Sequence, residues 1–451
     1  MWTRIASISG LRGVVGDGLD PADIVRFAAA YASRREPGPI VVGHDGRPTA
    51  PTFLAAVLAG VTATGHDVLL AGPVATPTLG RLVADRGAVG GIQISASHNP
   101  PAYNGLKFFQ PAGMVLGPAE GRSVLARFEG GDFGWASWDR LGKVHPIDDP
   151  DAAHLTRVLM TADVEAIARR KFTVVLDACH GAGGRMGEAL LRDLGCTPMV
   201  LGGTPDGRYD HPPEPTAANL KRFAAIVPAA GAAVGFAQDP DADRLAIVDE
   251  TGRYIGEELT LALAASHRLS QQKGPVVLNL STSRTTEDVA VHLGCPVART
   301  PVGEIHVVER MLALAAVIGG EGNGGVIDPR VGFVRDSFVG MALVLDLLAA
   351  TGEPLSTLVD ALPRYAMVKD SYPRGEGEPG LIFEALAAEH PEAEVDRHDG
   401  LRLDWADAWA HVRASNTEPI VRVIAEAGDP SRARALADAL GRRVAAGGRE
   451  P

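Results

Sequence analysis

This 451-residue sequence contains few cysteines, and its basic residues are fewer than its acidic ones. The three cysteines, Cys179, Cys196 and Cys295, match neither a disulfide framework nor a metal-binding spacing. That usage suits a reducing compartment, so we expect a cytoplasmic protein. The 43 lysines and arginines stand against 55 acidic residues and leave a net charge of −12. This balance argues against a nucleic-acid partner, which normally meets a basic surface.

No apolar stretch is long enough to enter a membrane. The first residues lead into no apolar segment of a signal peptide, and the most apolar helical stretch, residues 338–350, is broken by Asp346. We therefore expect neither a membrane partner nor a secretion signal. No serine lies in a Gly-x-Ser-x-Gly turn, which argues against a serine hydrolase.

One order of elements recurs along the chain. Strand, loop and helix alternate until a third strand ends in a polar loop, which predicts related α/β units. We place three such α/β domains at residues 1–150, 151–254 and 255–365, and a small α+β domain at residues 366–451. If the domains surround a central cleft, their polar loops can meet there. The repeated series begin near residues 40, 172 and 275.

The first polar loop carries a serine beside a histidine. A buried-strand pattern over residues 90–94 breaks at Ser95–Pro100, which ends in the turn dipeptide Asn-Pro. Ser97 and His98 then lie at the carboxyl edge of a sheet, where open α/β folds bind ligands. We expect Lys107 in the same loop, as an acid or base if cations lower its pKa. The alternative is that the motif is only a turn.

The second polar loop carries three alternating carboxylates, Asp239, Asp241 and Asp243. In an extended loop they point the same way and can bind one hard cation, whereas without a cation they repel one another. A calcium loop fits the spacing and Glu250, but Arg244 stands where that loop needs glycine, and strand patterns flank it. A solvated acidic turn is the other alternative. We favour Mg²⁺.

Two further loops offer groups for a phosphorylated sugar. Residues 320–325, Gly-Glu-Gly-Asn-Gly-Gly, lack the lysine of a nucleotide-binding loop, and their glutamate and asparagine suit sugar hydroxyls. Residues 413–417, Arg-Ala-Ser-Asn-Thr, supply a guanidinium, hydroxyls and backbone N–H groups, which together form a phosphate cradle. An ordinary turn is the alternative for each. Arg12 and the charged loop 44–47 are interpreted individually as solvated.

Together these loops resemble those of the α-D-phosphohexomutase family, in its order and over essentially the whole chain. Ser95–Pro100 is similar to the phosphoserine loop, residues 239–244 to the metal loop, 321–323 to the sugar loop and 413–417 to the phosphate loop. The resemblance implies a phosphorylated Ser97 and one Mg²⁺ held by that phosphoserine and the three aspartates. It also implies phosphoryl transfer to a hexose phosphate through a hexose bisphosphate.

The resemblance, with the residues themselves, defines the expected site. We expect catalysis to involve Ser97, His98, Lys107 and Arg12. We expect substrate binding to involve Arg244, Glu321, Asn323, Arg413, Ser415, Asn416, Thr417 and Arg422. The partner is then a small sugar phosphate, and the enzyme is a monomer or homodimer.

Three positions depart from the commoner family pattern: Pro240 replaces glycine, Pro301 replaces lysine and Asn323 replaces serine. These features resemble the branch identified with phosphoglucosamine mutase in archaea and some bacteria. We therefore expect interconversion of glucosamine 6-phosphate and glucosamine 1-phosphate. Phosphomannomutase/phosphoglucomutase activity is the alternative, and a calcium- or sugar-phosphate-binding module is the non-enzymatic one.

Overall fold

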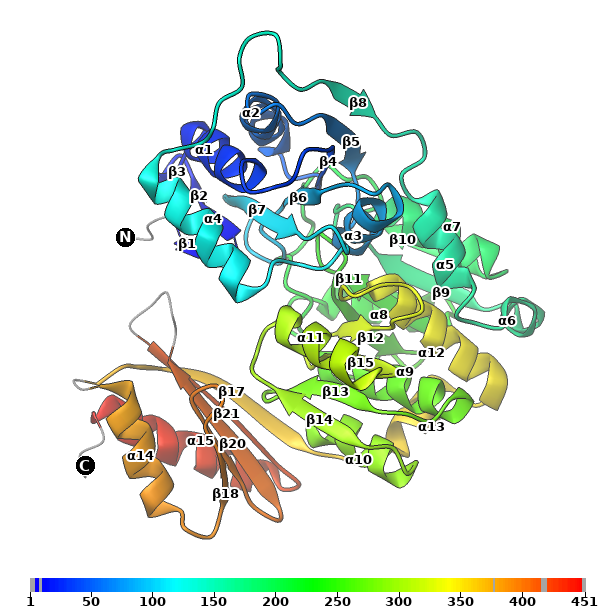
Figure 1. Ribbon diagram of the computed structural model, residues 1–451. Helices are drawn as coiled ribbons and strands as arrows, with labels where there is room; N and C mark the ends of the chain where they lie inside the picture. Colours follow the sequence, from blue (N-terminus) through cyan, green and yellow to red (C-terminus); the bar gives the residue numbers. More distant parts are fainter. Residues whose placement is uncertain (1–4, 8–9, 376–377, 415–419, 448–451) are drawn as a thin grey trace.

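The protein is built on four sheets in the computed structural model, which describes residues 5–7, 10–375, 378–414 and 420–447 (Figure 1). The expected α/β class, with three related α/β domains and a C-terminal α+β domain, is confirmed. Within the described ranges, every helix is too short or too polar to cross a bilayer.

The first sheet has eight strands in the order β1-β2-β7-β6-β4-β5-β8, with β3 paired to β2. Strands β4, β5 and β6 are parallel, and β6 is buried along its whole length. Helix α1 begins where the Asp20 side chain accepts the N–H of Asp23 at 2.9 Å. The elements are β1 (Ile5–Ser7), β2 (Gly10–Val15), β3 (Gly18–Leu19), α1 (Pro21–Ala32), β4 (Ile40–His44), α2 (Ala50–Thr62), β5 (Val68–Pro73), α3 (Thr76–Asp85), β6 (Gly90–Ile94), β7 (Tyr103–Phe109), α4 (Pro118–Gly130) and β8 (Val144–Pro146).

The second and third sheets share one topology, with strand orders β10-β9-β11-β12 and β14-β13-β15-β16. In each, three strands are parallel and the last is antiparallel. The second domain comprises α5 (Ala152–Leu159), α6 (Val164–Arg170), β9 (Thr173–Asp177), α7 (Gly184–Asp193), β10 (Thr197–Leu201), α8 (Lys221–Ala229), β11 (Val234–Gln238) and β12 (Leu245–Asp249). The third comprises α9 (Glu257–Gln271), β13 (Val276–Asn279), α10 (Arg284–His292), β14 (Val297–Thr300), α11 (Glu304–Leu314), β15 (Ile318–Glu321), β16 (Gly325–Ile327), α12 (Ser337–Thr351) and α13 (Leu355–Asp360).

Each polar loop lies inside a hairpin, between the third parallel strand and an antiparallel fourth strand. The pairs are β6 with β7, β11 with β12, and β15 with β16. Lys107 therefore lies on a strand, and our placement of it in a loop is wrong. The expected loop over residues 320–325 is also shorter, because both of its ends belong to strands. A hairpin needs only a short connection, so it fixes each polar loop at the edge of its sheet.

The second and third domains share one hydrophobic core. Residues such as Leu176 and Phe236 of the second sheet and Leu278 and Ile318 of the third belong to the same buried cluster. Helix α12 is buried from Ser337 to Leu348 within this cluster. A helix that is apolar on all sides is stable only when it is covered on all sides.

The fourth domain has an antiparallel sheet in the order β17-β21-β20-β19-β18, against which α14 and α15 pack. Its hydrophobic cluster contains only residues of this domain. Figure 1 shows it beside the third domain, next to β13 and β14. The elements are β17 (Ala366–Pro373), α14 (Pro379–Glu389), β18 (Glu394–Asp396), β19 (Leu401–Asp404), β20 (Ala408–Ala414), β21 (Ile420–Ala427) and α15 (Pro430–Ala445).

Candidate active site

Ser97 brings a hydroxyl of the first domain to a carboxylate of the second. Its φ of 51° lies in the left-handed region, which residues other than glycine rarely adopt. Where they do adopt it, they are often part of a functional site. Its N–H donates to Ser95 Oγ at 2.8 Å, and its Oγ donates to Asp239 Oδ2 at 2.8 Å. His98 Nδ1 lies 3.2 Å from the same Oγ. The hydroxyl is thus buried and oriented.

Arg47 holds the loop that carries Ser97. It is fully buried and pairs with Asp45 at 2.9 Å, and Asp45 Oδ2 also accepts Ser95 Oγ at 2.7 Å. The interpretation of loop 44–47 as solvated is wrong for Asp45 and Arg47, because both side chains are fully buried. Arg47 instead satisfies backbone carbonyl groups. The guanidinium donates to the backbone oxygens of Ser97, Asn99, Pro100 and Tyr103.

Asp239, Asp241 and Asp243 are fully buried and each offers an oxygen within 4.8 Å of the others. The loop turns instead of extending, because Ala242 has a φ of 55° and its N–H donates to the Asp239 carbonyl at 2.9 Å. The extended conformation that we expected is wrong, although the carboxylates do converge. Strands flank the loop on both sides, unlike the helices of a calcium loop.

The triplet has the donor set of a magnesium site. Asp241 Oδ1 and Asp243 Oδ1 are buried and accept no hydrogen bond from the described residues, which is costly unless a cation binds there. Their Oδ2 atoms are satisfied by neighbours that orient both carboxylates. The donors are Thr76 Oγ1 to Asp241 at 2.5 Å, Lys107 Nζ to Asp241 at 2.5 Å and to Asp243 at 2.9 Å, and Arg335 Nη2 to Asp243 at 2.7 Å.

Lys107 carries its positive charge between two of these carboxylates. Burial lowers its pKa, but Asp241 and Asp243 outweigh burial and hold the pKa above its ordinary range. The condition under which Lys107 would act as an acid or base, a pKa lowered by cations, is not met, because its nearest charged groups are anions. Burial raises the pKa of Asp243, but the positive charges of Arg335 and Lys107 outweigh burial, so the pKa is lowered overall. Burial and the neighbouring carboxylates raise the pKa of Asp239.

Arg12, His98 and Arg244 also border the triplet. Arg12 lies on β2 opposite Gly105 of β7, and burial lowers the pKa of its guanidinium. Burial, followed by Arg244 and Arg12, lowers the pKa of His98 to about 2, so its imidazole is neutral at physiological pH. The backbone N–H of Arg244 donates to Asp239 Oδ1 at 3.1 Å. Two guanidiniums and a neutral imidazole therefore surround the serine and the carboxylates.

Arg335 joins the metal loop to the sugar loop. Besides Asp243, it donates to Glu321 Oε2 at 2.7 Å, and its Nε lies 3.2 Å from Glu304 Oε2. Burial raises the pKa of Glu304 to about 7. Burial also raises the pKa of Glu321, but Arg335 outweighs it and keeps that pKa low. Arg335 and Glu304 were not predicted from the sequence. The only signal for Arg335 was its position beside the helix cap Asp336.

The sugar loop begins at Glu321, the last residue of β15. Glu321 Oε1 accepts Asn279 Nδ2 at 2.8 Å and the N–H of Gly303 at 3.2 Å. Asn323 Nδ2 lies 3.4 Å from Glu321 Oε2, while Asn323 Oδ1 is buried and accepts nothing from the described residues. The loop therefore presents one open acceptor beside a saturated carboxylate.

Only the start of the expected phosphate loop is described. Arg413 of β20 is half-buried, pairs in register with the exposed Arg422 of β21, and donates through Nε to Asp399 Oδ1 at 2.9 Å. Three further candidates lie outside the described residues: Ser415, Asn416 and Thr417.

The chain matches four domains of the phosphoglucomutase/phosphomannomutase family. They are alpha/beta/alpha domain I at residues 4–135, domain II at 152–252, domain III at 256–365 and the C-terminal domain at 374–442.

Relatives match over nearly the whole chain. A protein of Methanopyrus kandleri named probable phosphoglucosamine mutase is 36% identical over 437 residues, covering 95% of this chain and 95% of its own. A phosphoglucomutase/phosphomannomutase of Thermococcus kodakarensis is 36% identical over 434 residues, covering 94% and 95%.

Solved structures of phosphohexomutases have the same fold as this chain. A phosphoglucomutase/phosphomannomutase family protein of Burkholderia thailandensis has a TM-score of 0.85 at 26% identity, covering 98% of this chain and 96% of that one. The N-acetylphosphoglucosamine mutase of Aspergillus fumigatus, solved with GlcNAc-6P and magnesium, shares the fold at a TM-score of 0.58 and 16% identity, covering 98% and 96%.

The chain has four domains, and the first brings a serine to the buried carboxylate triplet of the second. This is the organisation of a phosphohexomutase. The chain belongs to the phosphoglucomutase/phosphomannomutase family, and the expected family resemblance is confirmed.

Proposed function

We propose that the chain is a cytoplasmic, phosphoserine-dependent mutase that interconverts glucosamine 6-phosphate and glucosamine 1-phosphate. The observation that carries the proposal is the 2.8 Å contact of Ser97 Oγ with Asp239 inside the carboxylate triplet. Phosphoryl transfer depends on positioning and charge neutralisation, which a nucleophile and cation ligands in one buried cluster supply.

The reaction conserves one phosphoryl group on the enzyme. Phosphorylated Ser97 gives its phosphoryl to the free hydroxyl of the hexose phosphate, so the bond from phosphorus to Oγ breaks and a bond to the sugar oxygen forms. The proton of the sugar hydroxyl ends on Ser97 Oγ. The resulting hexose bisphosphate turns over, and its other phosphoryl returns to Ser97 with the reverse proton movement.

The charged residues divide the remaining work. The three aspartates and the phosphoserine would hold one Mg²⁺, which when bound neutralises charge on the phosphoryl oxygens. Lys107, held protonated by Asp241 and Asp243, and Arg12 add positive charge where the phosphoryl moves. His98 is neutral, and its Nδ1 lies 3.2 Å from Ser97 Oγ, so it can orient that hydroxyl. Arg413 and the rest of the phosphate loop bind the phosphate that is not reacting, in either orientation of the sugar.

Asn323 favours glucosamine as the sugar. Its buried Oδ1 lacks a donor among the described residues, and the amino group of glucosamine is a charged donor that glucose and mannose lack. The hydroxyl that glucose and mannose carry at the same carbon can also donate, but a charged donor makes the stronger hydrogen bond to an amide oxygen. The second candidate is phosphomannomutase/phosphoglucomutase activity, which is the name carried by the Thermococcus relative.

Ser97→Ala tests the function directly. We expect this variant to fold and to lose turnover of glucosamine 1-phosphate, glucose 1-phosphate and mannose 1-phosphate in coupled assays. Ser95→Ala is the control, because it loses a contact to the Ser97 N–H but keeps the nucleophile. It should retain measurable turnover and a phosphoryl group that peptide mapping places on Ser97. Full activity of Ser97→Ala, or a phosphoryl group on Ser95, would contradict the proposal.

A further inference from the structure

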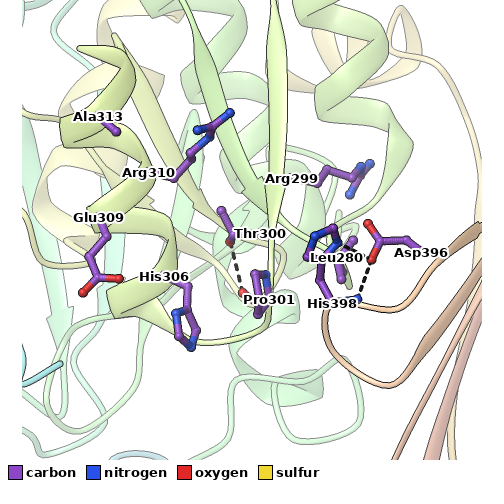
Figure 2. Close-up of a pocket in the computed structure, with 10 residues that line it drawn as sticks. All are labelled: Leu280, Arg299, Thr300, Pro301, His306, Glu309, Arg310, Ala313, Asp396 and His398. Atoms are coloured by element: carbon purple, nitrogen blue, oxygen red, sulfur yellow. Dashed lines mark hydrogen bonds and ion pairs between the residues drawn. The ribbon is translucent and has the colours of Figure 1, made fainter. Parts of the chain in front are cut away.

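Two loops face one another where the third and fourth domains meet. One loop, residues 301–303, joins β14 to α11, and the other, residues 397–400, joins β18 to β19. Figure 2 shows Pro301 and the preceding strand residue Thr300 opposite His398 and the strand residue Asp396, beside a cavity of about 380 Å³.

Asp399 is the residue through which the second loop bonds the first. Its Oδ2 accepts the backbone N–H of Val302 at 2.9 Å, and its Oδ1 accepts Arg413 Nε at 2.9 Å. Its carbonyl accepts His411 Nε2 at 2.6 Å, and the other ring nitrogen of His411 lies 2.9 Å from Ser281 Oγ in the third domain. The Asp399 carboxylate thus bonds a guanidinium in the fourth domain and a backbone amide in the third.

The backbone amide that follows the bonded one is itself hydrogen-bonded to the sugar loop. Gly303 follows Val302 and donates its N–H to Glu321 Oε1 at 3.2 Å. Its φ of 131° is a conformation that favours glycine, and it lets two successive N–H groups serve two different carboxylates. A continuous series of hydrogen bonds therefore runs from Arg413 through Asp399 and the 302–303 turn to Glu321.

We propose that Asp399 is a positioning residue that fixes Arg413 relative to Glu321, so that one carboxylate sets the separation between Arg413 and the sugar loop. The inference rests on the proposed function of Arg413 and that loop. Asp399 holds Arg413 through Nε, a bond that uses neither of the two terminal nitrogens with which a guanidinium grips a phosphate. Asp399 itself is not required to touch the substrate.

Asp399→Asn tests the proposal with little change in size. The amide keeps one acceptor oxygen and turns the other into a donor, so one of the two contacts is lost. Hydrogen bonds to charged groups are strong enough that we expect KM for the sugar phosphate to rise about 10-fold or more, with kcat changed about threefold or less. Asp399→Ala loses both contacts and should raise KM further. In that variant, amide exchange at Val302, measured without substrate, should accelerate about 10-fold.

Asp396→Asn is the matched control, because Asp396 ends β18 just before the same loop and its side chain bonds only His398 among the described residues. It should leave KM, kcat and Val302 exchange within about twofold of wild type. A merely structural role for Asp399 predicts a lower unfolding midpoint and a smaller active fraction, with KM unchanged. Unchanged KM in Asp399→Asn, or unchanged Val302 exchange in Asp399→Ala, overturns the proposal. If the wild-type chain turns over no sugar phosphate, the proposed function fails, and the exchange result alone decides whether Asp399 makes this contact.

Discussion

Arg335 is buried against carboxylates from two parts of the third domain and one of the second: Glu304, Glu321 and Asp243. Desolvating four charged groups is expensive, and their mutual attraction repays it only while all partners are present. The arginine also aims Asp243, because a donor on Oδ2 leaves Oδ1 free for a cation. Its removal should therefore affect stability and catalysis together.

Arg335→Met should lower the free energy of unfolding by about 3–5 kcal/mol, the cost of leaving buried carboxylates unpaired. Urea denaturation measures this change, and turnover of the folded variant should fall more than 10-fold. The control is Arg192→Met, which removes an exposed pair with Glu188 on one helix turn and should cost about 0.5 kcal/mol or less. Equal stabilities of the two variants would contradict the role given to Arg335.

His211 makes stability depend on pH. Its Nε2 lies 2.9 Å from Asp177 and its Nδ1 lies 2.8 Å from the Pro212 carbonyl, so only the imidazolium can donate to both. The hydrogen bond to Asp177 is the main cause that raises the pKa of His211. A raised pKa means that the folded state holds the proton more tightly, so this stabilisation is complete below about pH 6.5 and is lost as pH rises through the folded pKa.

His211→Gln tests that sign. The difference in unfolding free energy between wild type and variant should be largest near pH 6 and should shrink as the pH rises above about 7, measured by urea denaturation across the series. A difference that grows with pH would mean that His211 is neutral in the folded protein.

Local spacing predicts side chains that act near their own sequence neighbours. Ser97 and the three aspartates were named from the sequence because each motif lies within a few residues. Arg47 was interpreted as solvated and Arg335 was not predicted, since what makes a lone arginine functional is a partner far along the chain. The direction of the Lys107 pKa shift could not be predicted for the same reason: Asp241 and Asp243 lie more than a hundred residues away.

At the scale of the elements, β2 and β7 approach closely enough to place Arg12 near Lys107. The two strands are antiparallel, and Arg12 stands opposite Gly105. A Cβ at Gly105 would lie 2.2 Å from the Leu11 carbonyl oxygen, so only glycine permits this spacing. Both cations therefore depend on a strand pair that cannot separate.

Gly105→Ala should push β2 away, cost about 1–3 kcal/mol of stability and lower turnover by displacing Arg12. The matched control is Gly130→Ala at the end of α4, where a Cβ would meet nothing within 4 Å. That substitution should be neutral or should stabilise by up to about 1 kcal/mol, because it reduces the freedom of the unfolded chain. Thermal unfolding and coupled assays on both variants measure the effects. Identical behaviour would contradict a close contact at Gly105.

The repeated element pattern was predictable, and so was β12 after the aspartate loop, but two antiparallel fourth strands, β7 and β16, were not. Parallel strands such as β4 and β6 are apolar runs, and their alternation with helices is visible in the sequence. Strand β7 contains Asn104, Gly105 and Lys107, which serve the site and hide its strand pattern. Strand β16 has three residues, too few for any periodicity. The functional residues of β7 and the shortness of β16 thus concealed two of the three strands that close the hairpins.

At the scale of the molecule, the domains are joined by different forces. The second and third share a hydrophobic core, which the sequence did not reveal because a helix buried on all sides, such as α12, shows no amphipathic face. The domain boundaries proposed from the repeat stay a prediction. The fourth domain has a separate core and is attached mainly through polar groups, an interface that normally permits relative movement.

Arg284 is the centre of that polar attachment. Its Nη2 donates to the Trp405 and Ala408 carbonyls at 2.7 and 3.1 Å, and its backbone N–H donates to Glu426 at 2.9 Å. Arg284→Ala removes the side-chain contacts and leaves both cores intact. We therefore expect calorimetry to resolve a separate transition for the fourth domain, about 8 °C or more below the main one.

The main transition should stay within about 2 °C of wild type, because the core shared by the second and third domains does not include this interface. Arg364→Ala, which removes an exposed pair with Asp360, should leave a single transition. A single transition for Arg284→Ala, shifted as a whole, would mean that the fourth domain unfolds with the others and that its attachment is not carried by these polar contacts. Independent unfolding would instead make the fourth domain the part of the molecule free to move when a sugar phosphate binds, with Asp399 limiting where Arg413 comes to rest.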